Sequence, residues 1–235
     1  MKVEKFNDYY ELSVKLGEII IEHLKEEGCI TLPSGDTPLK AYQYVAEQYK
    51  LNPFEIKATI FGLDEWVGLD KNDYGSCQYY MHKDLYSKLN LKKEQVVEFN
   101  AKADDLENEC KKMNEAIKKF NNFKLVVLGI GMNGHLGLNE PGVSFKNYAH
   151  VVDLSKSTKE VAQKYFNDNQ ELEKGITLGV KNFLEADKLI LIASGSKKKE
   201  IIKRIIESDV CEQIPATSAK LHKNSFLMVD KSCID

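Results

Sequence analysis

The chain has 235 residues, of which 43% are hydrophobic, and a formal net charge of −3. This length and apolar content are enough for one large domain with a substantial core, which excludes extensive disorder. The slightly negative charge and the lack of a Lys/Arg-rich arm at either end disfavour nucleic acid or another polyanion as a partner.

Cysteine usage and the apolar runs indicate the compartment. The five cysteines are an odd number without C-x-x-C spacing, which is typical of reduced thiols in the cytosol rather than of a disulfide framework or a zinc site. No uninterrupted apolar run approaches the roughly 18 residues that span a bilayer, and residues 1–7 do not resemble an export signal. We therefore expect a cytoplasmic protein without a membrane partner.

The first half of the chain alternates helix-like and strand-like segments. Apolar residues at helical spacing predict a helix over residues 9–27 that opens the fold, and Gly28 is a suitable stop. A short apolar strand over 29–32 then leads through a loop of small residues into the next helix. The remaining expected elements are a helix over 39–49, a strand over 58–63, and helices over 74–89 and 103–120.

The second half continues this alternation. A β-branched apolar run over residues 125–128 predicts a buried strand of a mostly parallel sheet. Residues 167–174 form a charged connection with chain breakers, which could act as a lid. The other expected elements are strands over 150–154, 188–193 and 225–229, and helices over 157–166, 175–186 and 197–208.

No linker, repeat or low-complexity tract divides residues 1–235. The alternation of strands and helices therefore predicts an α/β fold, in which a single domain holds a mostly parallel twisted sheet with helices on both faces. Such sheets bind ligands at the carboxyl ends of their strands. The loops that follow the strands are the places to search for a site.

The loop after the central strand carries the strongest site signal. Gly129, Gly131 and Gly134 allow left-handed backbone or the close approach of a ligand. His135 is the only one of five histidines that glycines enclose at a strand end, and the ordinary pKa of histidine suits proton transfer near neutrality. Glu140 could orient or polarise this imidazole.

The three glycines also match the G-x-G-x-x-G dinucleotide fingerprint, with Asp153 beyond them. However, residues 139–142 form a turn signal where the fingerprint needs the middle of a helix. We therefore expect no nicotinamide binding and no other cofactor. Neither H-x-H nor H-E-x-x-H spacing nor an acidic calcium loop is present, so we also expect no metal site.

Two loops of small residues have the character of anion sites. Ser34, Gly35 and Thr37 lie between a strand and a helix N-terminus, where backbone N–H groups and the helix dipole favour phosphate. Asp36 argues against this interpretation, and an ordinary N-cap by Asp36 or Thr37 is the alternative. Residues 194–198 repeat the design with lysines that could reach a phosphate, unless these lysines are merely a solvated face.

A pair of carboxylates, Asp64 and Glu65, directly follows the strand expected at 58–63. At least one of them should lie at the carboxyl edge of the sheet, where partial desolvation can raise its pKa toward that of a general base. A surface turn is the alternative.

Three segments together resemble the glucosamine-6-phosphate deaminase/isomerase family: residues 63–68 (LDEWVG), 129–142 (GIGMNGHLGLNEPG) and 175–180 (GITLGV). The resemblance covers nearly the whole chain and implies the modified Rossmann-like fold of that family. Residues 32–38 and this chain's forms of the acidic and histidine motifs look closer to the galactosamine-6-phosphate isomerase branch.

The resemblance implies an aldose–ketose isomerisation coupled to loss of ammonia. In the favoured interpretation, galactosamine 6-phosphate gives tagatose 6-phosphate and ammonium; the alternative substrate, glucosamine 6-phosphate, gives fructose 6-phosphate. His135 would open the sugar ring with Glu140 tuning its imidazole, and Asp64 would carry the proton from C2 to C1. No cofactor is needed, because an α-proton next to a polarised carbon is within reach of a positioned carboxylate.

The same resemblance implies a phosphate site made of Ser34, Gly35, Thr37, Lys164 and Lys198. Lys164 stands where other members have arginine, so it supplies charge without the bidentate fork. Asn133 stands where well-known members have aspartate; it can still hydrogen-bond the histidine but cannot stabilise imidazolium charge. Ring opening would then depend more on Glu140.

Two other functions are alternatives. A 6-phosphogluconolactonase shares the architecture and a related glycine-histidine loop, but that resemblance weakens after His135. A non-catalytic regulator that binds sugar phosphate would lack the acid–base residues, whereas Asp64, His135 and Glu140 are all present.

Quaternary structure and regulation are less constrained. The sequence leaves subunit number open, with a homo-oligomer as an alternative to a monomer. The chain stops soon after Val229, without the tail of long, allosterically regulated family members, so we expect no control by amino-sugar effectors.

Overall fold

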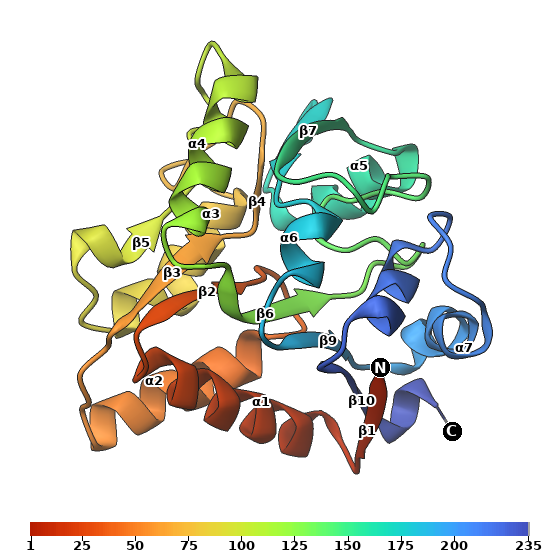
Figure 1. Ribbon diagram of the computed structural model, residues 1–235, viewed down its shortest axis with the longest axis horizontal. Coiled ribbons are helices and arrows are strands. Elements are labelled where there is room, and N and C mark those ends of the chain that lie inside the picture. The colour runs from red at the N-terminus through yellow and green to blue at the C-terminus, as the bar shows by residue number, and fades with distance from the viewer. Residues whose placement is uncertain (235) are drawn as a thin grey trace.

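The computed structural model describes residues 1–234, and its main sheet has seven strands (Figure 1). These strands are β1 (Lys2–Phe6), β2 (Gly28–Leu32), β3 (Ala58–Gly62), β5 (Val96–Val97), β6 (Phe123–Gly129), β9 (Leu189–Ala193) and β10 (Ser225–Asp230). They lie in the order β1-β10-β9-β6-β2-β3-β5, and every neighbouring pair is parallel. The prediction of a mostly parallel sheet is confirmed.

A second, smaller sheet is antiparallel and was not predicted. It consists, in spatial order, of β4 (Asp64–Trp66), β8 (Lys174–Thr177) and β7 (His150–Asp153). Only Leu63 separates β3 from β4, so the chain passes directly from one sheet to the other. Figure 1 shows β4 and β7 above the main sheet.

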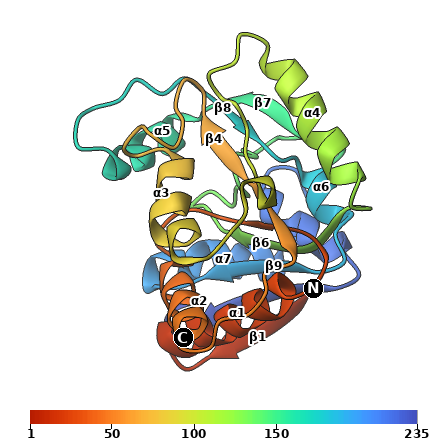
Figure 2. The same ribbon diagram turned by 90° about the vertical axis from the view of Figure 1, so that its left-hand side faces the viewer.

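The helices cover both faces of the main sheet, as predicted. The α-helices are α1 (Tyr9–Leu24), α2 (Leu39–Leu51), α3 (Cys77–Asp84), α4 (Leu106–Lys118), α5 (Lys156–Ala162), α6 (Val180–Leu184) and α7 (Lys199–Glu207). Short 3-10 helices are η1 (Tyr86–Lys88), η2 (Lys93–Gln95), η3 (Gln163–Tyr165), η4 (Ser196–Lys198), η5 (Pro215–Leu221) and η6 (Lys231–Cys233). Figures 1 and 2 show α1 and α2 side by side on one face. The core contacts place α4, α6 and α7 on the other face.

The first helix shows how local sequence and packing agree. Leu12, Leu16, Ile20 and Leu24 recur every four residues and are all fully buried against the sheet. Asp8 caps the helix, because its carboxylate accepts a hydrogen bond of 2.8 Å from the backbone N–H of Glu11 (Oδ1···N). The sequence therefore specifies both the start of α1 and the face that it buries.

The central strand β6 is apolar from Leu125 to Leu128 because both of its faces are covered there. Leu125 and Val127 pack in the cluster that contains α1 and α2, whereas Val126 and Leu128 pack in the cluster that contains α4, α6 and α7. Removing one such buried side chain, as in Val127→Ala, should cost roughly 1–3 kcal/mol of stability.

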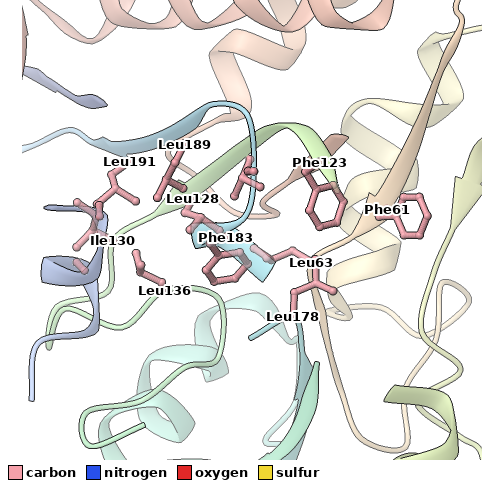
Figure 3. Close-up of a cluster of buried hydrophobic side chains, with 14 of the residues drawn as sticks. Phe61, Leu63, Phe123, Leu128, Ile130, Leu136, Leu178, Phe183, Leu189 and Leu191 are labelled. Atoms are coloured by element: carbon pink, nitrogen blue, oxygen red, sulfur yellow. The ribbon is translucent and has the colours of Figure 1, made fainter. Parts of the chain in front are cut away.

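The loop after β6 is itself part of this core. Figure 3 shows Ile130 and Leu136 in one cluster with Leu128 and Leu191, and Leu136 is fully buried. A backbone hydrogen bond of 3.0 Å from Gly131 N to His135 O closes the loop. The glycine-rich segment is therefore fixed in place by packing.

Three sequence predictions differ from the structure. A strand, β1, and not a helix opens the fold. The helix expected over 175–186 is replaced by β8 and the short α6, because Gly175 packs so closely that a Cβ there would lie 2.2 Å from Leu138 Cδ1. The helix expected over 74–89 is shorter, since Ser76 caps α3 and Gly75 has a φ of 93°.

The order of the strands places the polar loops together. The neighbours β9, β6, β2 and β3 are each followed by a loop that the sequence singled out, and all four loops leave the same, carboxyl edge. The chain order reverses between β2 and β6, and α/β sheets bind ligands at such switch points. Within residues 1–234, no helix is both long enough and apolar enough to cross a membrane.

Candidate active site

A cavity of about 850 Å³ lies at this carboxyl edge, enclosed on the other side by α5 and η3. Eight of the nine residues that the sequence nominated line it: Ser34, Gly35, Thr37, Asp64, Asn133, His135, Lys164 and Lys198. The ninth, Glu140, is buried behind His135 and contacts Asn133. The fold thus brings all nine nominated residues to one place.

Two phenols, the half-buried Tyr9 and the buried Tyr42, hold the loop between β2 and α2. The hydroxyl of Tyr9 donates to the backbone oxygens of Asp36 and Thr37, each at 2.9 Å, and the hydroxyl of Tyr42 donates to Pro33 O. Gly35 has a φ of 106°, and a Cβ there would lie 3.1 Å from the hydroxyl of Tyr165. The loop is therefore held in place at the start of α2, and the positive φ at position 35 favours glycine there.

A carboxylate supports the second loop of small residues, which follows β9. Asp230, at the end of β10, accepts hydrogen bonds from the hydroxyls of Ser194 and Ser232. In this loop, Lys198 directs its ammonium group into the cavity wall, where it donates to Ile130 O. Burial, reinforced by the nearby positive charge of Lys164, lowers the pKa of Lys198.

Asp64 lies at the start of β4, where the chain leaves the main sheet. Gly137 lies beside this carboxylate: it has a φ of 58°, and a Cβ there would lie 3.4 Å from Asp64 Oδ2 and only 2.9 Å from Thr177 Oγ1. Burial raises the pKa of Asp64 from 3.8 to about 6, although a hydrogen bond from the thiol of Cys77 opposes the rise. The group can therefore both accept and release a proton near neutral pH.

The neighbouring carboxylate, Glu65, has a structural position. It is fully buried, and its oxygens accept hydrogen bonds from the backbone N–H groups of Trp66, Cys77 and Gln78 at 2.8, 3.0 and 2.8 Å. Two of these donors begin α3, so Glu65 fixes this helix against β4. Of the two adjacent carboxylates, only Asp64 lines the cavity.

His135 lies directly over Gly131. A Cβ at position 131 would be 2.4 Å from atoms of the imidazole, so any side chain there would displace the ring. Burial lowers the pKa of His135 and the positive charge of Lys198 acts in the same direction, while the carboxylate of Glu140 opposes both. The imidazole is therefore neutral at pH 7 and can accept a proton.

Asn133 and Glu140 support the imidazole from behind. Asn133 accepts a hydrogen bond of 3.1 Å from the backbone N–H of His135 (Oδ1···N) and donates one of 2.9 Å to Glu140 (Nδ2···Oε2). It thus bonds the histidine backbone and not the imidazole. Glu140 Oε2 lies 3.9 Å from His135 Nδ1, and this nitrogen has no hydrogen-bonding partner among the described residues.

Two hydroxyl groups that the sequence analysis did not single out hold Glu140. Ser155 donates to Glu140 Oε1 at 3.1 Å, and Thr158 donates to the same oxygen. Ser155 is also the N-cap of α5, where it accepts from the backbone N–H of Thr158. The capping pattern in the sequence predicts only the helix start. The contact of Ser155 with Glu140 depends on how α5 packs.

Lys164 lies at the end of α5 and η3 that faces the first loop. Its ammonium group forms an ion pair of 2.7 Å with Asp36 Oδ2. Burial acts to lower the pKa of Lys164, but the interactions with Asp36 and Tyr165 together outweigh this and leave the pKa above its ordinary value. Asp36 therefore does not repel anions as a free carboxylate would, because a lysine accompanies it.

These groups have two chemical capacities. Asp64 and the neutral His135 are proton acceptors that line the cavity, whereas Lys164, Lys198 and the two loops offer positive charge and N–H donors to an anion. Within residues 1–234, no three His, Cys, Asp or Glu side chains cluster as metal ligands would.

Comparison with known proteins agrees with this arrangement. The family described as glucosamine-6-phosphate isomerases/6-phosphogluconolactonase matches residues 11–228. A glucosamine-6-phosphate deaminase of a Thermoanaerobacter species is 37% identical in an alignment that covers 98% of this chain and 93% of the relative. The glucosamine-6-phosphate deaminase of Halalkalibacterium halodurans is 34% identical in an alignment that covers 100% of this chain and 97% of that protein.

Solved structures show the same fold. A monomeric glucosamine-6-phosphate deaminase superposes with a TM-score of 0.95 at 31% identity, over 99% of this chain and 98% of that one. A 6-phosphogluconolactonase from Thermotoga maritima superposes with a TM-score of 0.76 at 20% identity, over 98% of this chain and 99% of that one, which shows the fold alone. The chain belongs to the family of glucosamine-6-phosphate isomerases and 6-phosphogluconolactonases.

Proposed function

We propose that this protein is a hexosamine-6-phosphate isomerase that also deaminates its substrate, and that the substrate is glucosamine 6-phosphate. The observation that carries the proposal is the convergence of Asp64, His135 and two lysines on one cavity. A proton acceptor for carbon, a neutral imidazole and a separate anion site are what this reaction requires.

The charge distribution orients the substrate. The phosphate lies between Lys164, Lys198 and the backbone of Gly35 and Thr37, close to the N-terminus of α2. The opposite end of the hexose, with C1 and C2, then faces Asp64 and His135. Because the phosphate is bound at a site separate from Asp64 and His135, the reacting carbons are free to change geometry during the reaction.

Ring opening comes first and uses His135. The neutral imidazole takes the proton of the O1 hydroxyl and returns it to the ring oxygen, so that the C1–O5 bond breaks and C1 becomes an aldehyde. Glu140 balances the positive charge that the imidazole carries in between, since its carboxylate is 3.9 Å away. Ser155, Thr158 and Asn133 keep this carboxylate in place.

Isomerisation then uses Asp64. The carboxylate takes the proton from C2, a C1–C2 enolamine forms, and O1 gains the proton that the substrate ammonium group gives up. Asp64 returns its proton to C1, which leaves an iminium group at C2. Water adds there and ammonium leaves, giving the ketose 6-phosphate. A carboxyl pKa of about 6 suits both halves of this transfer.

We propose glucosamine 6-phosphate rather than galactosamine 6-phosphate as the substrate because of the names that the relatives carry. The motifs resemble the galactosamine branch, but the proteins that match over nearly the full chain carry the name glucosamine-6-phosphate deaminase. The two sugars differ only in the configuration at C4, which is remote from the atoms that react. Fructose 6-phosphate and ammonium are therefore the proposed products.

A coupled assay tests both levels of the proposal. Ammonium release is measured with glucosamine 6-phosphate and galactosamine 6-phosphate, and the ketose is identified by chromatography. The proposal expects ammonium from both or from the gluco epimer, with a higher kcat/KM for the latter. Higher kcat/KM with the galacto epimer would overturn the substrate assignment. Hydrolysis of 6-phosphogluconolactone without any ammonium release from either amino sugar would overturn the reaction.

A further inference from the structure

A second, much smaller cavity lies behind Asp64, on the side away from the main cavity. Its volume is about 10 Å³, close to the space that one water molecule needs. Ser34, Asp64 and Cys77 line both cavities and separate them. We call the small one the rear chamber; its other polar lining residues are Gln78, Tyr86 and Glu98.

Tyr86 gives the rear chamber an unsatisfied donor. Its side chain is buried, with 5% of its surface exposed, and its hydroxyl has no hydrogen-bonding partner among the described residues. A buried hydroxyl without a partner is unfavourable, whereas a water in an adjoining polar cavity would satisfy it. The free hydroxyl and the size of the rear chamber are two independent observations that point to the same ligand.

Beyond Tyr86 a pair of ionisable groups leads to the surface. Glu98 also lines the rear chamber, and its carboxylate lies 3.1 Å from His82 Nε2. The side chain of Glu98 is 16% exposed and that of His82 is 33% exposed, so the pair reaches solvent. The ring of His82 packs edge-on against Tyr86, with 5.1 Å between centroids.

The two other ionisable groups near Asp64 are Glu65 and Cys77, and both already have hydrogen-bonding partners. The carboxylate oxygens of Glu65 accept hydrogen bonds from the backbone N–H groups of Trp66, Cys77 and Gln78. Cys77 bonds Asp64 and Ser34 through its thiol, whose pKa burial raises well above its ordinary value. Neither group offers a route from Asp64 to solvent.

We propose that the rear chamber binds one water, held by the hydroxyl of Tyr86, and that this water connects Asp64 to the Glu98–His82 pair as a path for protons. Protonated Asp64 gives its proton to the water, the water passes a proton to Glu98, and His82 exchanges it with solvent. The same steps in reverse return a solvent proton to Asp64, so no net charge moves. Tyr86 and Glu98 are positioning residues in this path.

The path matters when the main cavity is occupied. Substrate then covers the face of Asp64 that lies beside Gly137, and the rear chamber is the remaining side of the carboxyl group. The inference rests on the proposed function, in which Asp64 holds the proton from C2 until it reaches C1. A path to solvent lets part of these protons exchange during that interval.

Isotope retention tests the path. Glucosamine 6-phosphate with deuterium at C2 is turned over in ordinary water, and mass spectrometry gives the fraction of product that keeps deuterium at C1. We expect partial retention in the wild-type protein and a rise toward full retention in Tyr86→Phe and Glu98→Gln. The fraction reports how the proton on Asp64 divides between transfer to C1 and exchange, so a change in the rate of substrate binding or product release does not alter it.

Asp84→Asn is the matched control, because Asp84, the last residue of α3, is acidic like Glu98 but lines neither cavity. It should show wild-type retention. Full retention in the wild-type protein, or equal retention in all variants, would overturn the path. Absence of ammonium release by the wild-type protein from either hexosamine phosphate would instead overturn the proposed function.

The water itself is tested without turnover. If the hydroxyl of Tyr86 holds a water, Tyr86→Phe loses a hydrogen bond and its Tm falls below that of the wild-type protein. If the hydroxyl is simply unpaired, removing it relieves a penalty and the Tm rises. A rise in Tm would therefore overturn the water site whatever the catalytic result.

Discussion

Asp36 and Lys164 are 128 positions apart in the chain, yet their side chains form an ion pair of 2.7 Å at the end of the cavity. The pair joins the loop before α2 to η3, and both residues line the cavity. The ammonium group of Lys164 is thereby held where the proposed phosphate binds. An incoming phosphate then competes with Asp36 for the same lysine.

This competition predicts the effect of Asp36→Asn. Removing the carboxylate frees Lys164 for the substrate and removes a negative charge beside the phosphate, so KM for the hexosamine 6-phosphate should fall. Since the side chains are about half exposed or more, the effect should be modest, of about 1 kcal/mol or less. Steady-state kinetics at low and high salt measure it, and an unchanged or raised KM at low salt would contradict it.

Lys164→Met should have the opposite effect. The methionine keeps much of the stem and loses the charge, so KM should rise about tenfold, equivalent to about 1.4 kcal/mol, more than kcat falls. Lys159→Met is the control, because Lys159 belongs to α5, pairs with Glu173 and does not line the cavity. Equal KM values in the two variants would remove Lys164 from the phosphate site.

Asp64→Asn tests the proton transfer at carbon. The amide keeps the size of the side chain but cannot accept the C2 proton, so kcat should fall by roughly 10²- to 10⁴-fold while substrate still binds. Kinetics together with a binding titration separate these two effects. Asp187→Asn, an exposed carboxylate paired with Lys124, should keep wild-type kcat. Wild-type turnover in Asp64→Asn would remove the role assigned to this carboxylate.

Thr158→Val tests the support of Glu140. The valine keeps the shape of the threonine and loses the hydroxyl that donates to Glu140 Oε1. Glu140 should then hold a less fixed position beside His135, and kcat should fall with a shift in the pH profile. Thr59→Val, in β3 and outside both cavities, is the matched control. An unaltered pH profile in Thr158→Val would show that this hydroxyl contributes to packing and does not position Glu140.

Stability should fall as the pH rises through the range in which Asp64 and Glu65 ionise. Burial raises their pKa values from 3.8 to about 6 and from 4.5 to about 7, so the folded protein binds more protons than the unfolded chain in this range. For Asp64 this corresponds to about 3 kcal/mol. Asp64→Asn should therefore gain stability relative to the wild-type protein at pH 8 but not at pH 4. Urea unfolding at both pH values measures the difference, and equal differences would refute it.

The main sheet was predictable because parallel strands that are covered on both faces must be apolar. Residues 125–128 of β6 and all of β9 show this as unbroken apolar runs. The edge strand β1 lacks this signal, since Lys2 and Glu4 alternate with its apolar residues and only β10 pairs with it. The short β8 contains Gly175, and only its pairing with β4 and β7 reveals it as a strand.

The candidate site was predictable to the extent that its residues directly follow strands. Asp64 and His135 meet this condition, and the geometry of the sheet then brings them together. The hydroxyls of Ser155 and Thr158 do not, because they reach Glu140 only through the packing of α5. Asp36 and Lys164 are also far apart in the sequence. The local sequence pattern therefore indicated only that the negative charge of Asp36 would disfavour anion binding.

The boundary between the neighbouring strands β2 and β6 divides the loops that line the cavity into two groups, one from each half of the main sheet. The loops after β2 and β3 come from one half, and those after β6 and β9 come from the other. In the proposed mechanism, the first half supplies Asp64 and the second supplies His135, so neither half alone carries both proton acceptors. A folding intermediate with only one half assembled should therefore be inactive, and activity should appear only once β2 pairs with β6.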